Sequence, residues 1–104
     1  SITTSSVNGN EIVFSLGILG DNDPSFALSA YVAERHPNAV ATITHDDRGD
    51  GYCLFRLNDS SKIDFSLIEN DERILFAHKN GFVAKTHDKL ESTEILELFE
   101  KSST

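Results

Sequence analysis

Cysteine is nearly absent from this sequence of 104 residues. Cys53 is the single cysteine, so the chain has no intrachain disulfide and no cluster of thiolates that could bind a metal ion. Cys53 stands within an apolar run, and we interpret it as an ordinary buried strand residue. A domain of this length can be stabilised by its hydrophobic core without such cross-links.

Long hydrophobic runs are also absent. No stretch approaches the ~20 apolar residues of a membrane-spanning helix. Residues 1–10 (SITTSSVNGN) have neither the basic start nor the apolar run of a secretory signal. We therefore expect a soluble, cytoplasmic protein without a membrane partner, folded as a single domain over residues 1–104.

Basic residues are few. The sequence has 9 Lys and Arg against 17 Asp and Glu, which gives a formal net charge of −8. A field of this sign repels polyanions at long range. Any phosphate group bound by this chain must therefore be held by a few local cations or by backbone amides, rather than by a broad basic surface.

The first half of the chain has the pattern of a strand followed by a helix. Residues 11–19 are rich in Val, Ile, Leu and Phe over a length that suits a buried strand. Asp23 and Pro24 are typical of a helix start, with Asp23 as the N-cap and proline in the first turn. Pro37 cannot continue a helix, so we expect this one to cover residues 24–35.

The second half contains more strands than helices. Strand-like runs cover residues 39–44, 52–58, 73–77 and 82–86. Residues 62–70 are typical of one short helix with Asp64 near its cap. Residues 91–101 predict a closing amphipathic helix capped by Ser92 or Asp88. Because helices and strands interleave without strict alternation, we expect an α/β (α+β) fold: a mixed sheet of about five strands with helices packed against it.

The loop at residues 45–51 invites a metal-binding interpretation. His45, Asp46 and Asp47 are ligand types for divalent ions, but three consecutive residues point in different directions, so a solvated turn is favoured. The overlapping run DDRGDG resembles a calcium loop, yet it lacks the carboxylate that should follow six residues after the glycine. We therefore expect no metal ion or other cofactor in this chain.

A more specific candidate for a ligand site lies at residues 76–86 (FAHKNGFVAKT), where His78, Lys79, Asn80 and Gly81 stand between two apolar runs. Asn-Gly between such runs favours a β-hairpin with a type I′ turn. An imidazole, an ammonium group and exposed amides in one loop are also typical of the polar end of a ligand site. A hairpin turn can hold a ligand, so both interpretations stay open.

Arg56 is a charged residue inside an otherwise apolar strand. The two-residue period of a strand sends it to the same face as Tyr52 and Leu54. A guanidinium in this position needs a partner, and a phosphate or carboxylate of a ligand could bind it through two hydrogen bonds. An ion pair with an acidic residue of the same chain would satisfy it equally well.

The order of these motifs resembles a known domain. The run YVAERHPNAVATITHDDRGDGYCLFRLNDSSKIDFSLIE, followed by AHKNGF and a closing amphipathic helix, is similar to the C-terminal associated domain of the Asp-His-His phosphoesterase superfamily. In that domain a phrase like HPNA leads to a strand, an Asp/Arg/Gly turn, a strand with a Leu-Arg-Ser-like motif, a DFSLI-like segment, a Gly-Gly-Gly-His loop and a Gly-Phe pair. The similarity covers residues 12–99.

The resemblance implies roles for single residues. Arg56 stands where the strand arginine of the family meets substrate phosphate, and His78 stands where the loop histidine touches the substrate near the scissile phosphate. Lys79 would be a further anion contact and Asn80 a polar one, while Gly81, in the Gly-Phe pair that opens the last strand, is also expected among the substrate-binding residues. The implied ligand is a nucleotide or a short single-stranded nucleic acid.

The chain also differs from the family pattern. Residues 75–77 (LFA) replace the glycines before the histidine, and their side chains would hinder close approach of a phosphate to the backbone. The family binds two metal ions, usually manganese, through an Asp-His-His motif in a separate N-terminal catalytic domain, and this sequence lacks that motif. We therefore expect the substrate-binding part of a metal-dependent phosphoesterase, a hydrolase, which is inactive without its catalytic partner domain. The alternative is a small α/β interaction module in which HKNG is only a turn.

Overall fold

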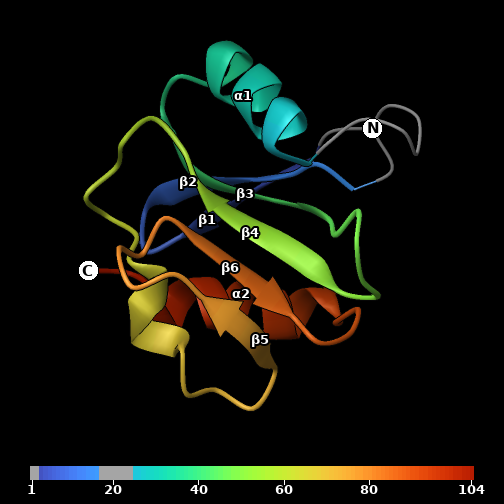
Figure 1. Cartoon of the computed structure of the whole chain (residues 1–104). Helices are drawn as coiled ribbons and strands as arrows, with labels where there is room; N and C mark the ends of the chain where they lie inside the picture. Colours follow the sequence, from blue (N-terminus) through green and yellow to red (C-terminus); the bar gives the residue numbers. More distant parts are fainter. Residues whose placement is uncertain (1–2, 17–24) are drawn as a thin grey trace.

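The structure, a computed structural model, describes residues 3–16 and 25–104, and within these ranges it has one sheet of six strands (Figure 1). The strands are β1 (Thr3–Val7), β2 (Asn10–Phe14), β3 (Ala39–His45), β4 (Tyr52–Arg56), β5 (Ile74–Ala77) and β6 (Val83–Thr86). The helices are α1 (Ser25–Arg35), the 3₁₀ helix η1 (Phe65–Ile68) and α2 (Ser92–Lys101). The strand order is β1-β2-β3-β4-β6-β5; β2 and β3 are parallel, and the other neighbours are antiparallel.

The structure confirms the predicted fold class, a mixed sheet with helices packed against it. The sheet gains a sixth strand because residues 3–7, which are mostly Ser and Thr, form β1. The sequence nevertheless contains a signal for the turn between β1 and β2. Asn8 and Gly9 have φ angles of 52° and 81° between the paired residues Val7 and Asn10, as a two-residue type I′ turn requires.

The β2–α1 segment agrees with the sequence in part. The strand expected at residues 11–19 begins one residue earlier, at Asn10, and ends at Phe14. α1 ends at Arg35, as predicted. The last part of the expected strand and the proposed helix start at Asp23 and Pro24 lie outside the described residues.

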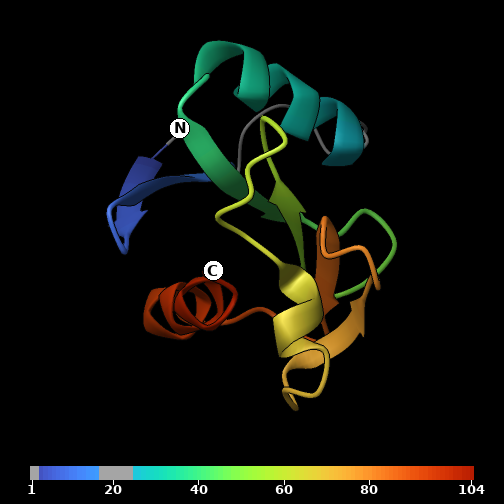
Figure 2. The same cartoon turned by 90° about the vertical axis from the view of Figure 1, so that its left-hand side faces the viewer.

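Successive residues of β2 point into two cores on opposite faces of the sheet. Val13 packs with Leu28 and Val32 of α1 in the smaller core. Ile12 belongs to the larger core, which lies between the sheet, η1 and α2. The helices contribute Phe65, Ile68, Ile95, Leu98 and Phe99 to the larger core. Each such side chain stabilises the fold by roughly 1.5–3 kcal/mol when fully buried. In Figure 2 the sheet lies between α1 and α2.

The two C-terminal helices begin differently from one another. Asp64 caps η1, as predicted, because its Oδ1 accepts a hydrogen bond of 2.9 Å from a backbone N–H of the first turn. For α2 the predicted caps Ser92 and Asp88 are wrong: the N-cap is Glu91, whose backbone N–H donates to the side chain of Glu94 at 3.2 Å. In the described part of the chain, no helix is long and apolar enough to cross a membrane.

Ion pairs among four charged side chains connect the segment before β5 to the last turns of α2. Arg73 Nη2 lies 2.8 Å from Asp71 Oδ2 and 2.8 Å from Glu97 Oε1, and Lys101 Nζ lies 3.3 Å from Asp71 Oδ2. The hydrogen bonds from Arg73 hold the pKa of Asp71 well below its ordinary value. Since Asp71 is largely buried, its negative charge depends on these two cations.

Replacement of Asp71 by Asn should lower the free energy of unfolding at neutral pH, because an amide cannot pair with Arg73 and Lys101 as an anion. The folded state depresses the pKa of Asp71 from 3.8, so its stabilising contribution is present above that pH and is lost as the pH falls further. In urea unfolding, the advantage of the wild type should therefore shrink between about pH 4 and pH 2. An advantage that stays constant over that range would contradict this account.

The control for this measurement is Asp59→Asn. Asp59 is exposed and has a φ of 50°, a conformation that Asn also tolerates. Its free energy of unfolding should stay within about 0.5 kcal/mol of the wild type at each pH.

Candidate functional site

The stretch at residues 76–86 is a β-hairpin. β5 and β6 pair antiparallel, and the N–H of Gly81 donates to the carbonyl of His78 at 2.8 Å. Lys79 and Asn80 are thus the central residues of the turn, and Gly81 follows with a φ of 77°. The predicted type I′ turn is wrong, because it needs positive φ at Asn80 as well as at Gly81, and Asn80 does not have it.

Three backbone amides of this turn, those of His78, Asn80 and Gly81, already donate hydrogen bonds inside the hairpin. The N–H of Asn80 donates to Nδ1 of His78 at 3.0 Å, and the N–H of Gly81 is bound to the His78 carbonyl. The N–H of His78 donates to the carbonyl of Val83 at 3.0 Å. A phosphate-binding loop instead leaves successive N–H groups free to point at the anion. The turn therefore offers side chains, rather than a row of amides, to a ligand.

Both the positive φ of residue 81 and the close packing of its neighbours favour glycine at this position. A Cβ atom at this position would collide with the carboxylate of Asp64, and the carbonyl of Gly81 accepts a hydrogen bond of 2.9 Å from the N–H of Phe65. A carboxylate this close repels phosphate. Packing and backbone conformation thus account for the glycine at position 81, and its expected substrate contact stays a prediction.

Arg56 ends β4 beside the turn. Its backbone N–H donates to the carbonyl of Phe82 at 2.9 Å, so the pairing of β4 reaches the residue just before β6. Its guanidinium is half-buried, and Nη1 lies 3.5 Å from the carbonyl oxygen of Ile63. Within residues 3–16 and 25–104, no Asp or Glu forms an ion pair with Arg56. The described part of the chain thus gives no support to an internal ion pair.

Three aromatic rings gather at the hairpin, those of Phe76, His78 and Phe82, which we call the ring cluster. The ring centroids of His78 and Phe82 are 4.5 Å apart, and those of Phe76 and His78 are 6.4 Å apart. Phe76 is 47% exposed and Phe82 is 42% exposed. Sequence reasoning missed this cluster, although the two-residue spacing of Phe76 and His78 places both rings on one face of a strand. Exposed rings of this kind mark binding surfaces for flat or apolar partners.

Arg56 and His78 lie at the same corner of the sheet but point to different sides of it. Phe82 connects them, through its carbonyl to Arg56 and through its ring to His78. Strand alternation directs Arg56, like Leu54, toward the face of the larger core. His78 follows Ala77, which packs against that face, and so points the other way. The strand and the turn meet at this corner, but no hydrogen bond or ion pair among the described residues joins the two side chains.

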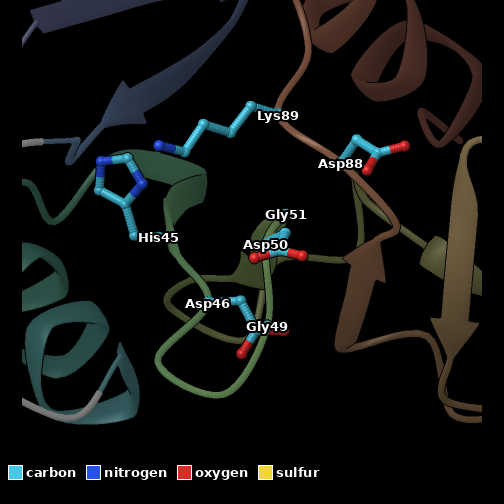
Figure 3. A pocket seen from close by; sticks show the side chains of 7 residues that line it. All are labelled: His45, Asp46, Gly49, Asp50, Gly51, Asp88 and Lys89. Carbon is cyan, nitrogen blue, oxygen red and sulfur yellow. The ribbon is translucent and has the colours of Figure 1, made fainter.

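A polar hollow of about 590 Å³ lies at the loop between β3 and β4, at the opposite end of β4 from Arg56 (Figure 3). It is lined by His45, Asp46, Gly49, Asp50, Gly51, Asp88 and Lys89. In Figure 3 the side chains of His45 and Lys89 reach toward one another, and that of Asp88 points away. Asp46, the buried carboxylate, is already bound by the N–H of Arg48 at 3.0 Å and by Lys85 Nζ at 3.3 Å. Among the described residues, no group of three or more His, Cys, Asp or Glu side chains could hold a metal ion.

No protein-family model matches this chain, and neither a curated protein nor a solved structure matches it. The resemblance to the C-terminal associated domain of the Asp-His-His superfamily thus rests on the sequence motifs alone. It stays a prediction. The geometry of Arg56 and the ring cluster has to be interpreted from its own chemistry.

The hydrogen bond from Asn80 predicts the tautomer of His78. Because Nδ1 accepts the N–H of Asn80, the neutral ring should carry its hydrogen on Nε2. Long-range ¹H–¹⁵N NMR spectra at about pH 8 should show this single form for His78. The exposed His87 serves as the reference ring in the same spectra. A His78 ring protonated on Nδ1 would show that the turn has a different geometry.

Proposed function

We propose that this chain binds a nucleotide, or the end of a short single-stranded nucleic acid, at the corner formed by Arg56 and the ring cluster. One observation carries the proposal: half-exposed aromatic rings lie at the same corner of the sheet as Arg56, whose guanidinium has no carboxylate partner among the described residues. Nucleotides combine a flat base with an anionic phosphate, and this corner offers a surface for each.

The ring cluster supplies the surface for the base. Every nucleobase has a π-face, and stacking on an aromatic side chain contributes roughly 1–3 kcal/mol per base. The exposed faces of Phe76 and Phe82 provide this contact without reading the identity of the base. The proposed selectivity is therefore for the class of ligand and not for its sequence.

Cations supply the phosphate contact. Arg56 is the last residue of β4 and points to the face of the larger core. The exposed Lys79 lies in the turn next to His78. A charge-assisted hydrogen bond of this kind contributes about 1.5–3 kcal/mol. A phosphate in contact with both residues would lie near Phe82, which directly precedes β6.

The overall charge limits the size of the ligand. A net charge of −8 opposes a long polyanion, and the cations at this corner are too few to bind an extended phosphate backbone. A mononucleotide or a short oligonucleotide end fits this balance best. Its binding should weaken as the salt concentration rises.

We place this binding activity in the substrate-binding part of an Asp-His-His-type phosphoesterase. In such an enzyme the catalytic partner domain would hold the metal ions that activate water and stabilise the leaving group. This chain would position the substrate through Arg56 and the ring cluster. We expect the purified chain by itself to produce no manganese-dependent turnover of a short oligonucleotide.

An NMR titration with adenosine monophosphate tests the proposal. Amide shifts should gather around Arg56 and the hairpin, and Arg56→Ala or His78→Ala should weaken binding by about tenfold or more. Lys89→Ala is the matched control, because Lys89 is an exposed cation in the polar hollow away from this corner. Adenosine and ribose 5-phosphate, which each lack one half of the ligand, should both bind more weakly.

Two results would contradict the proposed site. Shifts that survive in Arg56→Ala and vanish in Lys89→Ala would move the site to the polar hollow. An absence of shifts at millimolar ligand, in a chain whose spectrum shows it to be folded, would leave the interaction module as the better interpretation.

A further inference from the structure

The two edge strands of the described sheet differ in character. β1 presents Thr and Ser, with Thr4 exposed, as is usual for an edge that avoids pairing with other chains. β5 presents Leu75, which is 55% exposed, and Phe76, which is 47% exposed. Apolar side chains on an open edge promote contact with another strand, so proteins keep them where a partner binds.

The backbone of β5 also has a free side. The N–H of His78 points inward to the carbonyl of Val83, so antiparallel alternation turns the N–H and carbonyl of Ala77 outward. Among the described strands, none pairs with this outer edge. A bulge between Ile74 and Phe76 limits the regular part of the edge, so an added strand would pair along about three or four residues.

The hairpin has a charge opposite to that of the chain as a whole. Residues 73–87 contain three Lys or Arg residues and no Asp or Glu. Lys85 is paired with Asp46, and Arg73 is paired with Asp71 and Glu97. Lys79, in the turn, is exposed and has no ion-pair partner in the described part of the chain. The turn end of the β5 edge is therefore its positive end.

We propose that the β5 edge binds an extended segment of a partner protein, which adds to the sheet as a seventh strand. Backbone hydrogen bonds to the outer side of β5 would supply affinity, and alternate apolar side chains of the segment would cover Leu75 and Phe76. An Asp or Glu of the segment would lie beside Lys79. The partner is thus an apolar extended peptide with acidic residues at one end.

A second copy of this chain is a poorer occupant of the edge. The hairpin of a second copy contains no Asp or Glu between residues 73 and 87, so pairing β5 with β5 would bring no carboxylate of the hairpin to the unpaired Lys79. Charge complementarity therefore favours an acidic segment over self-association.

Selection from a displayed library of random peptides of about ten residues tests this inference. The immobilised wild type should enrich peptides with alternating apolar residues and Asp or Glu at one end. Leu75→Glu should abolish the enrichment, and Lys79→Glu should replace the acidic end by Lys or Arg. Thr4→Glu, on the edge strand β1, is the matched control and should enrich the same peptides as the wild type.

The best enriched peptide then provides a structural measurement. On binding, the amide of Ala77 should become protected from hydrogen exchange, and Leu75→Glu should weaken the affinity by about tenfold or more. Arg56→Ala should bind the peptide as the wild type does, which separates this inference from the nucleotide site. Three results would overturn it: no enrichment, enrichment that persists in Leu75→Glu, or a wild-type dimer in ultracentrifugation that Leu75→Glu converts to a monomer.

Discussion

The antiparallel pairing of β4 with β6 is the interaction on which the candidate site depends. Phe55 pairs with Val83 in this ladder, and the N–H of Arg56 extends it to the carbonyl of Phe82. The pairing brings the end of one strand next to a turn that lies far away in the sequence. Its register is fixed because Leu54 and Ala84, which pair with each other, both belong to the larger core. A slip by one residue would turn Leu54 out of that core and move Arg56 away from the ring cluster.

The sequence predicted the parts of the fold that periodicity and strong breakers control. Apolar runs predicted β3 to β6, and α1 ends before Pro37 as expected. β1 was missed because its Thr and Ser side chains show no apolar alternation, and it becomes a strand through the Asn8–Gly9 turn and pairing with β2. The type of the second Asn-Gly turn was wrong because the hairpin loop has four residues, 79–82, between His78 and Val83, which share a backbone hydrogen bond; the type I′ turn belongs to two-residue loops.

The candidate site was predictable as a set of residues but not as a geometry. Arg56 and His78 could be singled out by residue type and motif. Their opposite directions follow from the register of β4, β5 and β6, which the sequence does not specify. Phe82 connects the two expected polar residues, through its carbonyl to Arg56 and through its ring to His78. The use of the turn amides inside the hairpin also appears only in three dimensions, and it shifts the proposed phosphate contact from backbone to side chains.

The proposed function depends most directly on one contact, the stacking of a nucleotide base on the ring cluster. Intermolecular nuclear Overhauser effects in a sample saturated with adenosine monophosphate measure this contact directly. We expect effects between the base protons and the ring protons of Phe76 and Phe82. Effects from the base to His45 and Lys89 instead, or none to any ring of the hairpin, would contradict it.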